Sequence, residues 1–184
     1  MGGSGFCTEY GLEQNVRDTT ISCIYEGTTQ IQSLDLIGRK VLASKGKLLA
    51  NFTTVIADFC QANKDNADMT QFIEPLMQHV KQWGELTKEI GEQAAQDPQA
   101  VGGAAVDYMY FSGYVTLAYL WARMALVSQT AIADGSGEKA FYDAKVKTAQ
   151  FYFAKLLPRT TTYAQRINTG VEPYITMDVD QFAF

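Results

Sequence analysis

The chain has 184 residues, 47% of them hydrophobic, and a formal net charge of −5 from 15 Lys and Arg against 20 Asp and Glu. This length and composition suffice for one sizeable core without disulfides or metals. The sequence pI of about 4.9 argues against nucleic acid as a partner, because the overall field repels polyphosphate.

Helical patterns dominate, since the sequence has no Asn-Gly hairpin turn and no sustained period-two alternation. In chain order, the patterns predict a glycine-rich start, a short helix over 9–17, a loop over 18–28, and long helices over 29–43, 48–62, 70–96, 98–133 and 138–168, the last kinked at Pro158 and ended by Gly170. The helix over 98–133 is apolar nearly all round and should lie centrally. Short connections favour antiparallel packing, so the predicted fold is all-α: an up-and-down bundle of four to five long helices, preceded by a glycine-rich loop and a short helix.

Several function classes lack the residues they need. Cys7, Cys23 and Cys60 form no Cys-x-x-Cys pair, and His79 is the only histidine, so we predict free thiols and no metal site. The first six residues do not form a signal peptide. The most apolar stretch, 108–122, is shorter than the about twenty residues that cross a bilayer. A cytoplasmic protein is the expectation.

The candidate chemistry lies in the first forty residues. Thr29-Gln30-Ile31-Gln32 fits a capping box at a helix start, where unpaired N–H groups can receive a phosphate or a carbonyl. Glu26 stands just before that start, beside Gly27, which has no side chain to obstruct a ligand. This placement suits a general base, although a Glu before a helix is more often only a favourable surface charge.

At this point the residues resemble the acyl-CoA dehydrogenases, whose C-terminal domain carries an ordered set of motifs that this chain also has. They are Gly2-Gly3-Ser4-Gly5-Phe6, Glu9-Tyr10, Glu13, Arg17-Asp18, and Ile24-Tyr25-Glu26-Gly27-Thr28-Thr29-Gln30-Ile31-Gln32. An ordered set over thirty residues is far more specific than a lone glycine motif.

The resemblance implies a role for several of these residues. Glu26 would be the base that removes the α-proton of an acyl-CoA thioester while the β-hydrogen leaves as hydride to the flavin of FAD, giving a trans-2-enoyl-CoA. Gly27 would leave room for the thioester. Thr28 and Gln30 would contact FAD, and Gly2 and Gly3 would bring backbone close to the dinucleotide. Arg17 and Asp18 are interpreted as structural, in a local ion pair or helix-end contact.

The resemblance also predicts the organisation of the chain. Residues 1–44 would end the catalytic C-terminal domain, and 45–184 would be the extra helical region of larger bacterial members. The aromatic stripe of Tyr108, Phe111, Tyr114 and Tyr119 is assigned to the core. The family's N-terminal and middle domains have no counterpart here, so the chain is expected to be a fragment, inactive alone, of a fatty-acid β-oxidation enzyme. Expected partners are the missing domains, acyl-CoA, an electron acceptor and further copies of the chain.

Two other functions stay open. The chain could be a non-catalytic helical module for oligomerisation or interaction, derived from that family. It could also contact a membrane peripherally, since the last helix carries Lys139, Lys145, Lys147, Lys155 and Arg159. Such lysines more often form a solvated face.

Overall fold

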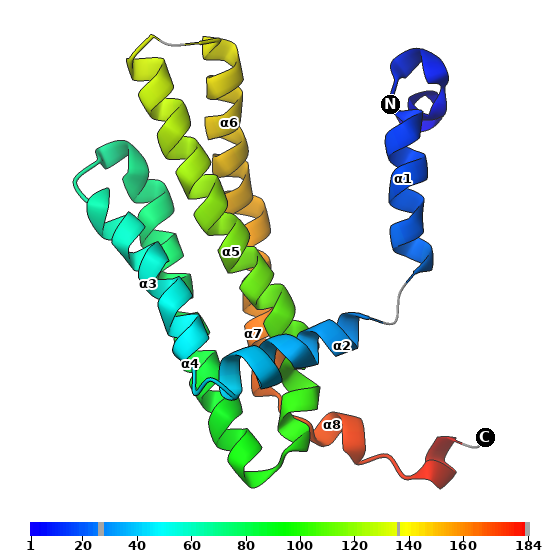
Figure 1. Cartoon of the computed structure of the whole chain (residues 1–184). Coiled ribbons are helices and arrows are strands. Elements are labelled where there is room, and N and C mark those ends of the chain that lie inside the picture. The colour runs from blue at the N-terminus through cyan, green and yellow to red at the C-terminus, as the bar shows by residue number, and fades with distance from the viewer. Residues whose placement is uncertain (26–27, 136, 183–184) are drawn as a thin grey trace. The chain divides into compact units, whose positions relative to one another are not determined.

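The computed structural model describes residues 1–25, 28–135 and 137–182, and the chain forms two compact units, Met1–Gln32 and Ser33–Phe184. All regular structure of the described residues is helical (Figure 1), which confirms the all-α prediction. The predicted division at residue 44 separates a catalytic motif from later helices, and it stays a prediction.

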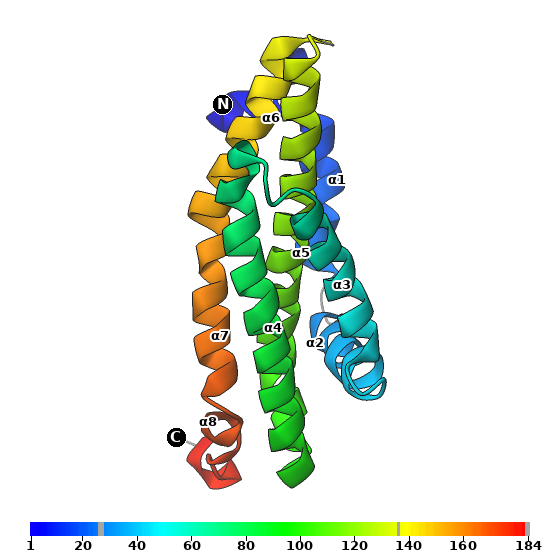
Figure 2. The ribbon, with the colours of Figure 1, turned by 90° about the vertical axis from the view of Figure 1, so that its left-hand side faces the viewer.

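The larger unit is an antiparallel bundle. Its helices are α3 (Lys47–Ala62), α4 (Thr70–Gln96), α5 (Gln99–Ala133), and a last long helix made of α6 (Lys139–Phe151), η5 (Tyr152–Leu156), η6 (Leu157–Arg159) and α7 (Thr160–Asn168). Successive helices run up and down beside one another (Figures 1 and 2). A further helix consists of α2 (Thr29–Leu34) and the π-helical stretch η3 (Asp35–Leu42), and η3 packs against α3, α4 and α5. The predicted bundle of four to five long helices is confirmed.

Helix α5 is the centre of the bundle, as its apolar composition predicted. It contacts α4, α6, α7 and η3, and its alanines at 104, 105, 118, 122 and 125 are buried, which allows neighbouring helices to approach closely. Tyr108, Phe111 and Tyr119 are also buried, and Tyr114 packs against the core. The assignment of the aromatic stripe to the core is therefore confirmed.

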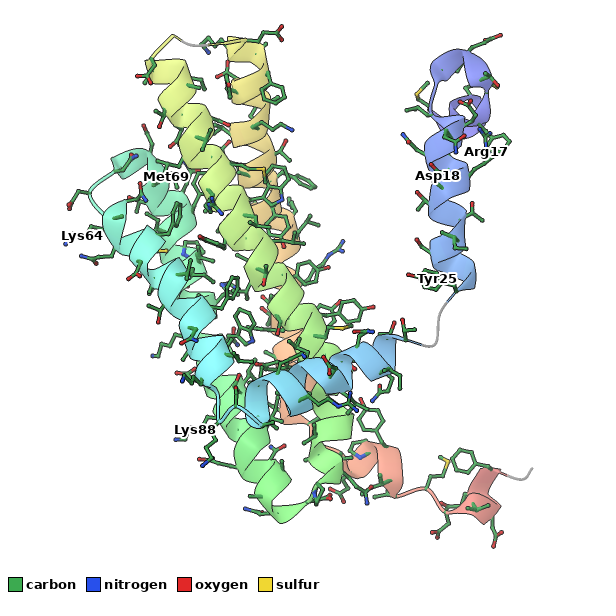
Figure 3. The ribbon with its side chains drawn as sticks, viewed as in Figure 1. Arg17, Asp18, Tyr25, Lys64, Met69 and Lys88 are labelled. Atoms are coloured by element: carbon green, nitrogen blue, oxygen red, sulfur yellow. The ribbon has the colours of Figure 1, made fainter. Side chains whose placement is uncertain are left out.

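Local sequence explains where several helices begin and end. Gly46 before α3 and Gly170 after α7 have φ of 77° and 76°, a left-handed conformation that glycine adopts at little cost. Asn66 accepts a hydrogen bond from the backbone N–H of Asp68 in the turn before α4. Met69 follows in the core, whereas Lys64 and Lys88 point outward (Figure 3).

The last long helix changes its winding near Pro158, where the sequence predicted a kink. A π-helical turn occupies Tyr152–Leu156, and a 3₁₀ turn containing Pro158 follows it. Tyr152 and Leu157 are both buried although they are five positions apart. A regular α-helix would turn positions five apart to different sides, so the wider π turn is what keeps both in the core.

The smaller unit differs from the sequence prediction. It contains η1 (Gly2–Phe6), η2 (Thr8–Tyr10) and α1 (Glu13–Ile24). The short helix was predicted over 9–17, and these bounds are wrong, because Gly11 adopts φ of 65° and the α-helix begins after it, at Glu13. The predicted loop over 18–28 is also wrong as far as residue 24. The hydroxyls of Thr19 and Thr20 donate to the carbonyls of Asn15 and Val16, so these residues complete their side-chain hydrogen bonds within the helix.

The segment after the bundle contains α8 (Glu172–Ile175) and η7 (Val179–Phe182). It begins against α5: a Cβ added to Gly103 would lie 3.2 Å from the side chain of Val171. The glycine therefore allows this segment to start close to the backbone of α5.

Candidate functional site

Four of the six predicted site residues lie in the described structure. Gly2 and Gly3 belong to η1, and Thr28 and Gln30 stand at the start of α2. Glu26 and Gly27, the predicted base and its neighbour, lie outside the described residues. The roles of all six therefore stay predictions.

The backbone at Gly2 and Gly3 is open. Gly2 has φ of 54°, and a Cβ added at either glycine would meet no atom within 4 Å. An L-residue with a side chain would be strained at Gly2. This open, glycine-dependent backbone fits a segment that a dinucleotide approaches closely.

The helix after the candidate base begins at Thr29. The N–H of Gln32 donates to the carbonyl of Thr28 at 2.7 Å, which is the first turn of α2. Thr29 is thus the first helical residue rather than the N-cap. The predicted capping box needs Thr29 as the N-cap, so it lies one position later than the observed helix start. The start of a helix carries the positive end of its dipole. The beginning of α2 is therefore electrostatically favourable for an acceptor or an anion.

Arg17 and Asp18 take part in a chain of side-chain contacts along α1. Arg17 donates to Gln14 at 2.8 Å, and Gln14 donates to Asp18 at 2.6 Å. The ion pair of Arg17 is with Glu13, at 3.8 Å, because residues one turn apart share a helix face whereas adjacent residues do not. Figure 3 labels Arg17 and Asp18 on this helix. The structure supports a local role, with Glu13 in place of Asp18 as the ion-pair partner.

In the part of the chain that the structure describes, no three His, Cys, Asp or Glu side chains gather in a way that could hold a metal ion. His79 lies within hydrogen-bond distance of the Pro75 carbonyl, at 2.7 Å, and of the Thr160 hydroxyl, at 3.0 Å. Pro75, whose carbonyl lies near His79, is the sixth residue of α4, the helix that also contains His79. Cys7 and Cys60 are free thiols, as predicted, and burial raises the pKa of Cys60 to about 11.

One buried acid, Asp107, was not predicted from the sequence as a residue of interest. Asp107 of α5 is 3% exposed, and its Oδ2 lies 3.3 Å from Nε of Arg166 on α7. Its Oδ1 has no hydrogen-bond partner among the described residues. Burial raises the pKa of this carboxyl, while Arg166 acts in the opposite direction. The signal for this acid in the sequence was its position alone among apolar residues. In the structure, the ion pair of Asp107 with Arg166 connects α7 to α5.

None of the helices built by the described residues combines the length and apolar character needed to cross a membrane.

Known proteins resemble most or all of this chain. A family model described as acetyl-CoA dehydrogenase C-terminal like matches residues 52–178. A broad-specificity linear acyl-CoA dehydrogenase of Mycobacterium tuberculosis is 31% identical, covering 100% of this chain and 31% of the relative. A 3-methylmercaptopropionyl-CoA dehydrogenase of Ruegeria pomeroyi is 30% identical over 95% of this chain and 30% of the relative. A butyryl-CoA dehydrogenase of Syntrophomonas wolfei is 28% identical over 86% of this chain and 26% of the relative.

The chain thus spans between a quarter and a third of the length of these curated relatives. The family match covers most of the helical bundle, from within α3 onward, and the first relative extends the likeness to the segment that contains Glu26. The chain belongs to the acetyl-CoA dehydrogenase C-terminal-like family and corresponds to a C-terminal portion of an acyl-CoA dehydrogenase.

Proposed function

We propose that this chain is the C-terminal part of a flavin-dependent acyl-CoA dehydrogenase of bacterial fatty-acid β-oxidation, acting in the cytoplasm. The parent enzyme would convert an acyl-CoA thioester to a trans-2-enoyl-CoA. The main support is that a relative named as an acyl-CoA dehydrogenase matches all of this chain, including the segment with the ordered motifs.

Glu26 is the proposed catalytic base, and it takes the proton from the α-carbon of the thioester. A carboxylate is a stronger base when water is excluded around it. Gly27 leaves space for the thioester beside Glu26. The backbone at Gly2 and Gly3, with Thr28 and Gln30, holds FAD. When bound, FAD supplies the acceptor for the hydride that leaves the β-carbon.

The rest of the parent enzyme is needed for this activity. The relatives are about three times as long as this chain, and a cofactor must be held against its substrate from several sides. We therefore propose that the chain is inactive alone. The missing N-terminal domains, an electron acceptor and further copies of the same protein are its proposed partners.

The decisive variant is Glu26→Gln in the chain joined to the remaining domains. The amide fills the same space but cannot take a proton. We expect bound flavin at the wild-type level and no bleaching of its visible absorption after anaerobic addition of an acyl-CoA. Glu89→Gln, at an exposed site of α4, is the matched control and should bleach normally. Bleaching by Glu26→Gln at the wild-type rate would remove Glu26 from its role.

A second experiment tests the inactivity of the isolated chain. The purified chain is incubated with FAD, passed through gel filtration and given an acyl-CoA without oxygen. We expect a folded, helical and colourless sample. Flavin that stays bound and bleaches would show a self-sufficient enzyme.

The alternative of a non-catalytic helical module is supported by one observation. Residues 33–184 form a compact unit with its own core. This alternative predicts that the chain joined to the remaining domains also fails to reduce flavin.

A further inference from the structure

An apolar groove lies between α5 and α6, near the end of the bundle where these helices meet. It has a volume of about 460 Å³ and is lined by Leu120, Met124, Val127, Phe141 and Tyr142, with Arg123 and Lys145 also at its walls. Val127 is 63% exposed and Phe141 52% exposed. Contiguous exposed apolar side chains with a charged rim are typical of an interaction surface.

The groove continues an unpartnered face of α5. Exposed apolar residues on this helix stand at Leu117, Leu120, Met124 and Val127, a spacing of three and four that keeps them on one face. Polar side chains would normally occupy a solvated face of a surface helix. This pattern predicts that another polypeptide segment covers the face.

The two cations of the groove have no acidic partner in the described structure. The guanidinium of Arg123 lies 5.5 Å from the centre of the Tyr119 ring, and Nζ of Lys145 lies 5.0 Å from that of Phe141. The ion pairs formed by the described residues include neither of them. A segment that combines apolar side chains with carboxylates would complement this groove.

The segment Val171–Phe182 of the same chain has that chemistry. Its exposed apolar residues include Tyr174, Met177, Val179 and Phe182, of which Val179 is 85% exposed. Its acids are Glu172, Asp178 and Asp180, and no Lys or Arg follows Arg166 in the sequence. This acidic segment exposes apolar surface while it is unpartnered.

The acidic segment does not reach the groove of its own bundle as it is folded. Its start is held near Gly103 of α5, and Met124 in the groove is 21 positions further along that helix, a separation of about 30 Å. Helical turns occupy 172–175 and 179–182. With these helical turns, residues 172–182 can span at most about 25 Å. This length is shorter than the separation between Gly103 and Met124.

We infer that the acidic segment docks in the groove of a second copy of this chain, in a two-fold dimer with the bundles antiparallel. The segment and the groove lie toward opposite ends of α5, so antiparallel pairing brings each segment to the other copy's groove and closes the assembly. Asp178 and Asp180 then face the second copy's Arg123 and Lys145. The inference rests on the homo-oligomer in the proposed function and is independent of its flavin chemistry.

The test is a charge swap measured by sedimentation equilibrium of the purified chain. One variant carries Arg123→Glu and Lys145→Glu, a second carries Asp178→Lys and Asp180→Lys, and a third combines all four. We expect each double variant to raise the dimer dissociation constant at least about tenfold, because like charges then meet. The combined variant should return to within about threefold of wild type.

The matched control replaces two exposed lysines away from the groove, Lys64→Glu and Lys147→Glu, and should leave the dissociation constant unchanged. Circular dichroism confirms that each variant is folded. A wild-type chain that stays monomeric would overturn the inference, and the Glu26→Gln experiment would still test the flavin chemistry. A dimer that neither double variant weakens, or that the combined variant fails to restore, would exclude this docking surface alone.

Discussion

The buried ion pair between Asp107 and Arg166 yields a quantitative prediction. Replacing Arg166 with Met keeps a long side chain at the surface but removes the only charge that the structure shows pairing with Asp107. The carboxylate would then be buried without a counter-charge. The variant should therefore be less stable than the wild type at neutral pH.

The magnitude follows from the exposure of the two partners. Removing one partner of a fully buried pair costs about 3–5 kcal/mol. Here Asp107 is 4% exposed in its side chain but Arg166 is 56% exposed, so water screens the interaction and we expect about 1–2 kcal/mol. For a chain of this size, that loss lowers the melting temperature by about 3–6 °C.

The pH dependence identifies the carboxylate as the cause. Burial raises the pKa of Asp107 above its value in the unfolded chain, so between these two pKa values the folded state binds more protons and stability falls as pH rises. Without Arg166, the pKa of Asp107 in the folded state rises further. The pH range over which stability falls therefore becomes wider. The loss caused by Arg166→Met should thus be larger at pH 7 than at pH 4.5 in melts followed by circular dichroism.

The control is Asp107→Asn in the Arg166→Met background, which removes the charge that is left unpaired. This double variant should show little of the added pH dependence. An equal loss at pH 7 and pH 4.5, or a melting temperature unchanged by Arg166→Met, would refute the reasoning.

Three further predictions concern the core. Phe111→Ala should cost about 3–5 kcal/mol in chemical unfolding because this fully buried ring leaves a cavity, whereas the exposed Phe151→Ala should cost well under half of that; equal losses would contradict the packing. Tyr108→Phe should cost about 0.5–1.5 kcal/mol, since it loses the bond to Thr87 while Thr87 still donates to the Trp83 carbonyl; a larger loss would point to a further partner of the hydroxyl, such as the Trp83 side chain. A thiol reagent at pH 8 should modify Cys7 quickly and Cys60 only after unfolding, because Cys60 is buried with a pKa of about 11; peptide mass spectra showing equal modification in the folded chain would disprove this.

The fold was largely predictable because strong local signals mark its helices. Pro98 and the turn after Ala133 delimit α5, and Gly170 ends α7. The short helix was misplaced because Thr19 and Thr20 are typical of loops, whereas in the structure their hydroxyls bond to carbonyls one turn earlier. Such bonds depend on neighbours that composition does not reveal.

The candidate site was less accessible to physical reasoning. A carboxylate before a helix start is common, so Glu26 could be singled out only by its likeness to a family. The isolated acid Asp107 was missed for a different reason. Its partner Arg166 is 59 positions away in the sequence, and only the packing of α7 on α5 brings the two together.

The π-helical turn at Tyr152–Leu156 bears on how this helix tolerates changes of length. It accommodates one residue more than a regular turn, while Ala149 before it, Tyr152 at its start, and Leu157 and Thr160 after it stay in the core. Removing a single residue within the turn would restore regular winding and keep both halves in register. The same deletion in the middle of α4 would rotate every later residue by about 100°. Natural length variants within this helix are therefore expected to cluster at the turn.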